Sequence, residues 1–175
     1  MIIENKKLVE SLIKYKVASL FAGIGGIDLA FQNAGFEIEW ANEIDKKACD
    51  TYNNNFKHKI ICDDIKNLDG AKLAKVDILT GCFPCQAFSI AGYRKGLQDE
   101  RGTLVFDLLR IAKELNPRIL FLENVKNLIS HNKGQTFKDI MQAIEDMGYK
   151  IKYKVLNTCE YSTIPQNRER VYSVL

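Results

Sequence analysis

The chain has 175 residues, of which 46% are hydrophobic, so it is long enough to enclose one substantial core and too short for two ordinary domains. No window approaches the roughly eighteen apolar residues that a membrane helix needs, and the N-terminal stretch lacks the apolar run of a signal peptide, so a soluble, cytoplasmic protein is expected. A net charge of +3 is compatible with a polyanionic partner but does not by itself indicate one.

The hydrophobic pattern alternates between strands and helices after a lysine-containing leader, residues 1–16. The expected order is strand 17–21, helix 26–34, strand 36–42, helix 45–56, strand 59–62, strand 76–80, helix 104–115, strand 118–123, helix 135–147, strand 149–157 and strand 170–175. This alternation is typical of an α/β fold with a doubly wound, mostly parallel sheet and helices on both faces. Ligands bind such a sheet beyond the carboxyl ends of its strands. We expect one domain over residues 1–175.

A glycine-rich turn, FAGIGG at residues 21–26, follows the first expected strand and opens the first helix. Glycines let the backbone turn tightly and leave room for a ligand. Glu43 ends the second strand about twenty residues after Gly23, where a carboxylate can accept hydrogen bonds from both hydroxyls of a ribose. Asp64 and Ile65, after the third strand, offer an acceptor for an adenine amino group and an apolar face for its ring. The pattern GxGG differs from GxGxxG, which favours a cofactor without a pyrophosphate; an ordinary strand-to-helix turn is the alternative.

Five cysteines without regular spacing indicate a reducing environment, and disulfides are not expected. Cys82 and Cys85 have the CxxC spacing of a redox pair or of half a zinc site. A redox motif normally opens a helix, however, and no second CxxC or histidine pair completes a zinc site, so no metal is expected. Cys82 is expected to be a core residue. Cys85 lies beyond Pro84 in a strand-end loop and is the candidate nucleophile.

Charged residues also flank the last two strands. Glu123 lies at the edge of an apolar strand, where burial would raise the pKa of its carboxyl and let it donate a proton to a ring nitrogen. An N-cap for the following segment is the alternative role. Arg168 and Arg170 precede the final strand, and their guanidinium groups suit a phosphate or a carbonyl oxygen, or simply form a charged turn.

Six segments together resemble, in order and spacing, the successive motifs of the DNA (cytosine-5)-methyltransferase family. They are FAGIGGIDLAF, ANEIDKKACDTYNNNF, GCFPCQAFSIAG, RGTLVFDLLRI, ENVKNL and PQNRERVYSVL. The resemblance implies the methyltransferase version of the doubly wound sheet. It also implies an enzyme of the restriction–modification type.

The same resemblance implies S-adenosylmethionine as the cofactor. Its ribose would lie on Glu43, and its adenine near Ile44, Asp64 and Ile65. The other cofactor-binding positions that it implies are Phe21, Gly23, Ile24, Gly25, Gly26, Pro84 and Leu104. Ile44 stands where many members of the family have an aromatic residue over the adenine.

The implied reaction methylates carbon 5 of a cytosine that is flipped out of double-stranded DNA. Cys85 would attack ring carbon 6, while Glu123 holds or protonates ring nitrogen 3 and so gives carbon 5 nucleophilic character. Loss of the proton on carbon 5 and elimination of Cys85 would then release 5-methylcytosine. Arg168 and Arg170 would support the carbonyl of the base and the geometry of the active site.

Residues 92–103 contain three glycines and three cations. In the family this segment is a loop that closes over DNA, and the candidate DNA contacts are Gln86, Ser89 and Arg94. A merely solvated loop is the alternative.

The family normally continues after the last of these motifs with a target-recognition domain and a C-terminal helix, and neither is expected in this sequence. Three interpretations stay open: a fragment of a longer enzyme, a subunit whose partner chain supplies target recognition, or a remnant that binds cofactor or DNA without turnover. From a different class, a CxxC thiol oxidoreductase would depend equally on Cys82 and Cys85.

Overall fold

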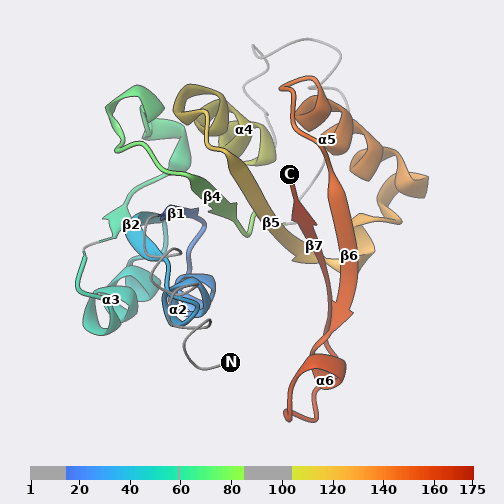
Figure 1. Ribbon diagram of the computed structural model, residues 1–175, viewed down its shortest axis with the longest axis horizontal. Coiled ribbons are helices and arrows are strands. Elements are labelled where there is room, and N and C mark those ends of the chain that lie inside the picture. The colour runs from blue at the N-terminus through green and yellow to red at the C-terminus, as the bar shows by residue number, and fades with distance from the viewer. Residues whose placement is uncertain (1–14, 59, 85–103) are drawn as a thin grey trace, which may run out of the picture.

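The computed structural model describes residues 15–58, 60–84 and 104–175, and its strands form one seven-stranded mixed sheet (Figure 1). The strands are β1 (Lys16–Leu20), β2 (Glu37–Glu43), β3 (Ile61–Cys62), β4 (Ile78–Gly81), β5 (Ile119–Val125), β6 (Lys152–Asn157) and β7 (Glu169–Val174). Their order across the sheet is β3-β2-β1-β4-β5-β7-β6. The pairs among β1 to β5 are parallel, whereas β7 runs antiparallel to both β5 and β6. The predicted doubly wound α/β fold is therefore confirmed.

Helices cover both faces of the sheet (Figure 1). They are α2 (Gly26–Asn33), α3 (Lys46–Asn55), α4 (Leu104–Leu115), α5 (Gln135–Glu145) and the short α6 (Thr158–Tyr161). Alternate strand residues point to opposite faces. Ala18 and Leu20 accordingly join the core beneath α4 and α5, whereas Ala41 packs with Cys49 and Tyr52 of α3.

Local sequence explains where the long helices begin and end. α4 buries Val105, Leu108 and Ile111 at helical spacing, and it stops before Pro117 at Asn116, whose φ of 52° lies in the left-handed region. α3 begins after Asp45, whose side chain accepts a hydrogen bond from the Ala48 amide. These boundaries agree with the helical periodicity of the sequence.

Four strands begin or end two or more residues away from the predicted boundaries, and the other three differ by one residue at each end. β4 begins at Ile78 and not at residue 76. β3 is limited to Ile61–Cys62, and β6 begins at Lys152 because Tyr149 instead packs inward and donates its hydroxyl to the Pro117 carbonyl at 2.6 Å. β5 continues to Val125, so Glu123 lies inside a strand and not at its end.

The short elements were not predicted, because three or four residues are too few to show a periodicity. They are α6 and the 3₁₀ turns η1 (Ile65–Asn67), η2 (Gly70–Lys72), η4 (Lys126–Leu128) and η5 (His131–Gly134). Within the described ranges, every helix is too short or too polar to cross a membrane.

Candidate active site

The carboxyl ends of the five parallel strands meet at one edge of the sheet. Leu20 at the end of β1 pairs with Asn42 of β2 and with Gly81 of β4, and Gly81 in turn pairs with Leu122 of β5. The residues that follow these positions therefore gather along this edge. Because β7 is antiparallel to β5, its first residues lie there too, with Arg170 paired to Val125.

The glycine turn and Glu43 form one hydrogen-bonded unit at this edge. Glu43 accepts the Gly23 amide on Oε2 at 2.9 Å, and its Oε1 accepts the amides of Ile44 and Asp45 at 2.9 and 3.0 Å. Gly23 and Gly25 have φ values of 57° and 91°, which glycine adopts without strain. Three amides thus hold the carboxylate in place, and they leave one lone pair, on Oε2, that can accept a hydroxyl group.

Two other positions of the turn have distinct conformations. Phe21 also has a positive φ, 56°, although it is not a glycine, and its partly buried ring packs against the main core. Gly26 is the first residue of α2, and a Cβ placed on it would have no atom within 4 Å. The turn therefore leaves open space beside the start of the helix.

Apolar side chains flank Glu43. Ile24 and Ile44 are both 62% exposed, which is unusual for isoleucine and suits contact with an apolar ligand surface. Asp64 is half-buried and accepts the Lys66 amide at the start of η1. Ile65 is only 3% exposed and packs in the main core, so its side chain has little surface left for an adenine ring.

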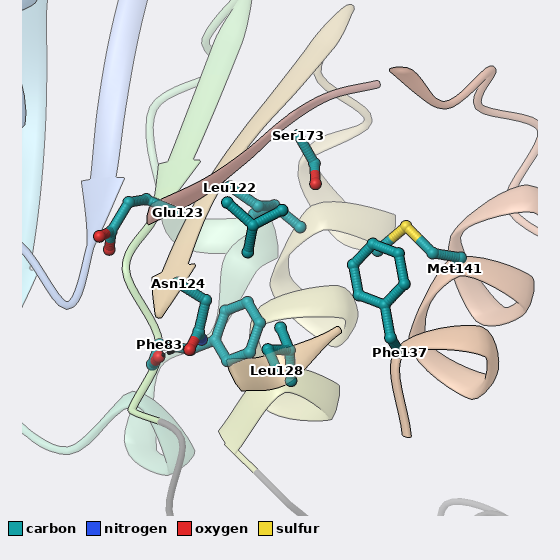
Figure 2. Close-up of a pocket in the computed structure, with 9 residues that line it drawn as sticks. Phe83, Leu122, Glu123, Asn124, Leu128, Phe137, Met141 and Ser173 are labelled. Carbon is teal, nitrogen blue, oxygen red and sulfur yellow. Dashed lines mark hydrogen bonds between the residues drawn. The ribbon is translucent and has the colours of Figure 1, made fainter. Parts of the chain in front are cut away.

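The loop after β4 is held against β5 by Asn124. This buried side chain donates from Nδ2 to the Phe83 carbonyl at 2.8 Å. Phe83 lines a small apolar pocket together with Leu122, Leu128, Phe137, Met141 and Val171, and Glu123, Asn124 and Ser173 complete its lining (Figure 2). Pro84 is exposed beyond Phe83, and Leu104, the first residue of α4, is half-buried.

Glu123 pairs with Arg170 across the β5–β7 ladder. Oε1 of Glu123 lies 3.0 Å from Nε of Arg170, and the two side chains are 18% and 19% exposed. The carboxyl of Glu123 points away from the pocket side chains Phe137 and Met141 (Figure 2). Glu123 does not take the alternative capping role, because Val125 is the N-cap residue of η4. Arg168 is exposed at the same edge, two residues before Arg170.

Cys82 is half-buried and belongs to neither core cluster, so it is not the core residue that the sequence predicted, but its thiol is still protected from ionisation. Burial raises its pKa to about 12, and the nearby carboxylates of Glu123 and Asp28 act in the same direction. Such a thiol stays protonated at neutral pH and is a poor nucleophile. The candidate nucleophile, Cys85, and the candidate DNA contacts, Gln86, Ser89 and Arg94, lie outside the described residues.

This edge therefore combines a rigid carboxylate beside a glycine turn with a second, arginine-paired carboxylate three strands away. The first group can hold a nucleoside, and the second can hold a polar ring. Asn124 was not singled out from the sequence, although it follows Glu123 directly. An asparagine at the end of a strand carries no signal for a partner as distant in sequence as Phe83.

Residues 15–175 match the family model described as C-5 cytosine-specific DNA methylase. The chain is 54% identical over 161 residues to the type II methyltransferase M.Bsp6I of Bacillus sp. (strain RFL6), covering 91% of this chain and 51% of that protein. It is 42% identical over 165 residues to the type II methyltransferase M.HhaI of Haemophilus parahaemolyticus, covering 94% and 50%. The chain thus spans about half the length of these curated relatives.

Solved structures also resemble the fold. The Dnmt2 methyltransferase of S. pombe superposes with a TM-score of 0.74 at 24% identity, covering 92% of this chain and 50% of that one. A DNMT2 mutant from Spodoptera frugiperda superposes with a TM-score of 0.72 at 25% identity, covering 92% and 49%.

Proposed function

Because the chain belongs to the C-5 cytosine-specific DNA methylase family, we propose that the carboxyl edge of its sheet carries out methyl transfer to carbon 5 of cytosine in double-stranded DNA. The observation that supports this most directly is the pair formed by Glu123 and Arg170, which are 3.0 Å apart at the same edge as the Glu43-bound glycine turn. The two groups sit where a flipped base and a nucleoside cofactor would have to meet.

S-adenosylmethionine, the methyl donor of this family, would supply the transferred group. The residues present fit its nucleoside part, since Glu43 has one lone pair left on Oε2 for a ribose hydroxyl and the exposed Ile24 and Ile44 offer apolar surface. Phe21, the glycines of the turn and Asp64 would complete the cofactor site. Since Ile65 is buried, we propose that it supports the adenine site from below and does not itself stack on the ring. Pro84 and Leu104 would close the site on the side of β4 and α4.

The chain's own residues would act on the base in successive steps. The thiolate of Cys85 attacks carbon 6, forming a carbon–sulfur bond and moving electron density to carbon 5. Glu123 holds ring nitrogen 3 at a stage when negative charge builds up on the ring. After the methyl group is in place, carbon 5 loses its proton and the carbon–sulfur bond breaks, which restores the double bond and releases Cys85.

Arg170 and Arg168 would have different roles in this scheme. Arg170 fixes the orientation of the Glu123 carboxyl through the Nε contact. The exposed guanidinium of Arg168 is placed to contact the carbonyl of the base or a phosphate. Gln86, Ser89 and Arg94 are proposed DNA contacts.

The relatives' designation as type II methyltransferases supports a role in a restriction–modification system. Since the chain spans about half of their length, reading of the target sequence by a further segment or a separate chain is part of this proposal. Our proposal favours these two arrangements over a remnant without turnover, because the cofactor turn and the Glu123–Arg170 pair are both present.

The proposal is tested by transfer of a labelled methyl group from S-adenosylmethionine to unmethylated DNA of mixed sequence. Cys85→Ser should abolish incorporation, because a hydroxyl at this position is not ionised at neutral pH. Cys82→Ser is the matched control and should keep most of the activity, since a half-buried thiol with a pKa of about 12 does not act as a nucleophile.

Equal loss in the two variants would refute the choice of nucleophile and favour a CxxC oxidoreductase, which a thiol-dependent disulfide-reduction assay would detect. Cys85-dependent incorporation by this chain alone would show that methyl transfer does not need the part that reads the target, whereas no incorporation would show that the further segment or separate chain is required for the reaction.

A further inference from the structure

Asp28 is a buried carboxyl group that the proposed reaction does not use. It lies in the first turn of α2 and is 1% exposed. An acid at this position commonly caps the amides at the start of its own helix. Here the N-cap residue is Gly25, and it receives no side-chain hydrogen bond. Asp28 instead faces the interior between β1 and α3.

The carboxyl collects hydrogen bonds from two directions. Ser19 of β1 donates its hydroxyl to Oδ1, and Tyr52 of α3 donates its hydroxyl to Oδ2 at 2.6 Å. A hydroxyl has a single proton, and Ser19 and Tyr52 both donate theirs to Asp28. Each can therefore only accept in its second hydrogen bond. Thr80 of β4 must then donate to Ser19 at 2.7 Å, and Nε2 of His58 must donate to Tyr52 at 2.8 Å.

The ring of Tyr52 also packs against the glycine turn at Gly25. A Cβ built on Gly25 would lie 2.9 Å from Cε2 of Tyr52 and closer still to the ring of Phe56. The two rings are stacked, with centroids 4.2 Å apart. Backbone and rings are therefore in direct contact, and the stacked rings of Tyr52 and Phe56 together limit how closely the turn can approach α3.

We propose that Asp28 and Tyr52 are positioning residues that hold the turn at residues 23–26 in the conformation that receives the cofactor. The hydrogen bond from the Tyr52 hydroxyl to Asp28 fixes the Tyr52 ring, and the ring packs against Gly25. The same network reaches Thr80, one residue before the end of β4, and so ties the turn to the strand that leads to Phe83 and Pro84. The link to the cofactor rests on the proposed function, whereas the effect on the turn does not.

The test compares Tyr52→Phe with Tyr149→Phe in the chain without cofactor. Tyr149 is the matched control, because its partly buried hydroxyl makes one hydrogen bond of 2.6 Å to the Pro117 carbonyl, away from the turn. Both variants lose a phenolic hydroxyl and should lower the melting temperature. Only Tyr52→Phe should accelerate amide hydrogen exchange in peptides covering residues 22–30, by roughly threefold to tenfold.

A conservative variant separates position from charge. In Asp28→Asn, the amide oxygen can accept from one hydroxyl while the amide nitrogen donates to the other, so exchange at the turn should stay within about twofold of the wild type. Asp28→Ala should behave like Tyr52→Phe. Equal exchange at the turn in Tyr52→Phe and Tyr149→Phe would overturn the inference.

A separate titration with S-adenosylmethionine distinguishes the effect of Tyr52 on the turn from its effect on cofactor binding. The dissociation constant of Tyr52→Phe should be roughly threefold to tenfold higher than that of the wild-type chain, whereas that of Tyr149→Phe should be unchanged. If the wild type shows no binding, the proposed function fails, while the exchange data still decide whether Asp28 and Tyr52 hold the turn. Binding that is unchanged in Tyr52→Phe despite faster exchange would overturn the link to the cofactor.

Discussion

At the residue scale, the two carboxylates of the site differ in what surrounds them. Glu43 receives three backbone amides, which fix its orientation without a counter-charge. Glu123 faces the guanidinium of Arg170 at 3.0 Å. A carboxylate held by amides suits neutral hydroxyl groups, whereas one paired to arginine suits a ring on which charge develops. The different surroundings therefore match the different roles proposed for them.

His58 makes stability depend on pH. Burial lowers its pKa below the ordinary value of 6.5, against the opposite influence of Asp28 and Glu39. The unfolded chain therefore takes up this proton at a higher pH than the folded chain. The stability from a neutral His58 is fully present above about pH 6.5 and is lost as the pH falls through the lower, folded-state pKa.

We expect the melting temperature of the wild type to fall between about pH 7.5 and about pH 5.5, and the fall to be smaller in His58→Gln. Glutamine can still donate to Tyr52 but does not titrate. His131, the other of the two histidines, belongs to η5, and His131→Gln should leave the difference caused by His58 in place. An identical pH profile in the wild type and His58→Gln would contradict this assignment.

At the element scale, α4 packs directly on the end of β4. A Cβ on Gly81 would overlap Cδ1 of Leu108 and lie 3.4 Å from Cδ2 of Leu122. Leu108 is fully buried, so its side chain has no space into which it can move. Glycine at this position thus allows a helix and a strand to approach closely at the edge that carries the site.

Gly81→Ala should therefore lower the free energy of unfolding by about 1–3 kcal/mol, because the extra methyl group overpacks this contact. Urea denaturation measures the change. Gly26→Ala is the matched control, since a methyl group there meets no atom within 4 Å, and its stability should be unchanged or slightly higher. A loss of stability that is the same in both variants would point to glycine flexibility and not to the contact with Leu108.

At the scale of the whole molecule, one core joins distant parts of the chain. It contains Leu20 of β1, Leu108 of α4, Ile140 of α5 and Val171 of β7. Since the sheet is continuous from β3 to β6, no described strand belongs to a separate layer. The single domain that we expect from the sequence should consequently unfold as one unit.

The chain's one tryptophan allows this to be measured. Trp40 is buried in β2 and donates to the Ala74 carbonyl at 2.9 Å, so its fluorescence reports on the first half of the sheet. Far-ultraviolet circular dichroism reports on all helices, including α5. We expect the two urea transitions to coincide; separate midpoints would show that the two halves unfold independently.

Much of the fold was accessible from local sequence. In the part of the chain that the structure describes, helical and strand periodicities located the four long helices and the seven strands, with the larger errors at the ends of β3, β4, β5 and β6. The errors arise where a side chain has a nonlocal partner, as Tyr149 does in the Pro117 carbonyl. The assignment of individual residues to the cofactor and to DNA stays a prediction.

The sequence by itself determined the order of elements, the turn at residues 21–26 and the presence of Glu43 at the end of its strand, because these depend on neighbours in the chain. Only the tertiary structure decided that β7 runs antiparallel to β5 and so brings Arg170 to Glu123. It also decided that Asp28 turns inward to Tyr52. These contacts join residues far apart in sequence, and their geometry follows from strand pairing and packing, which no local pattern encodes.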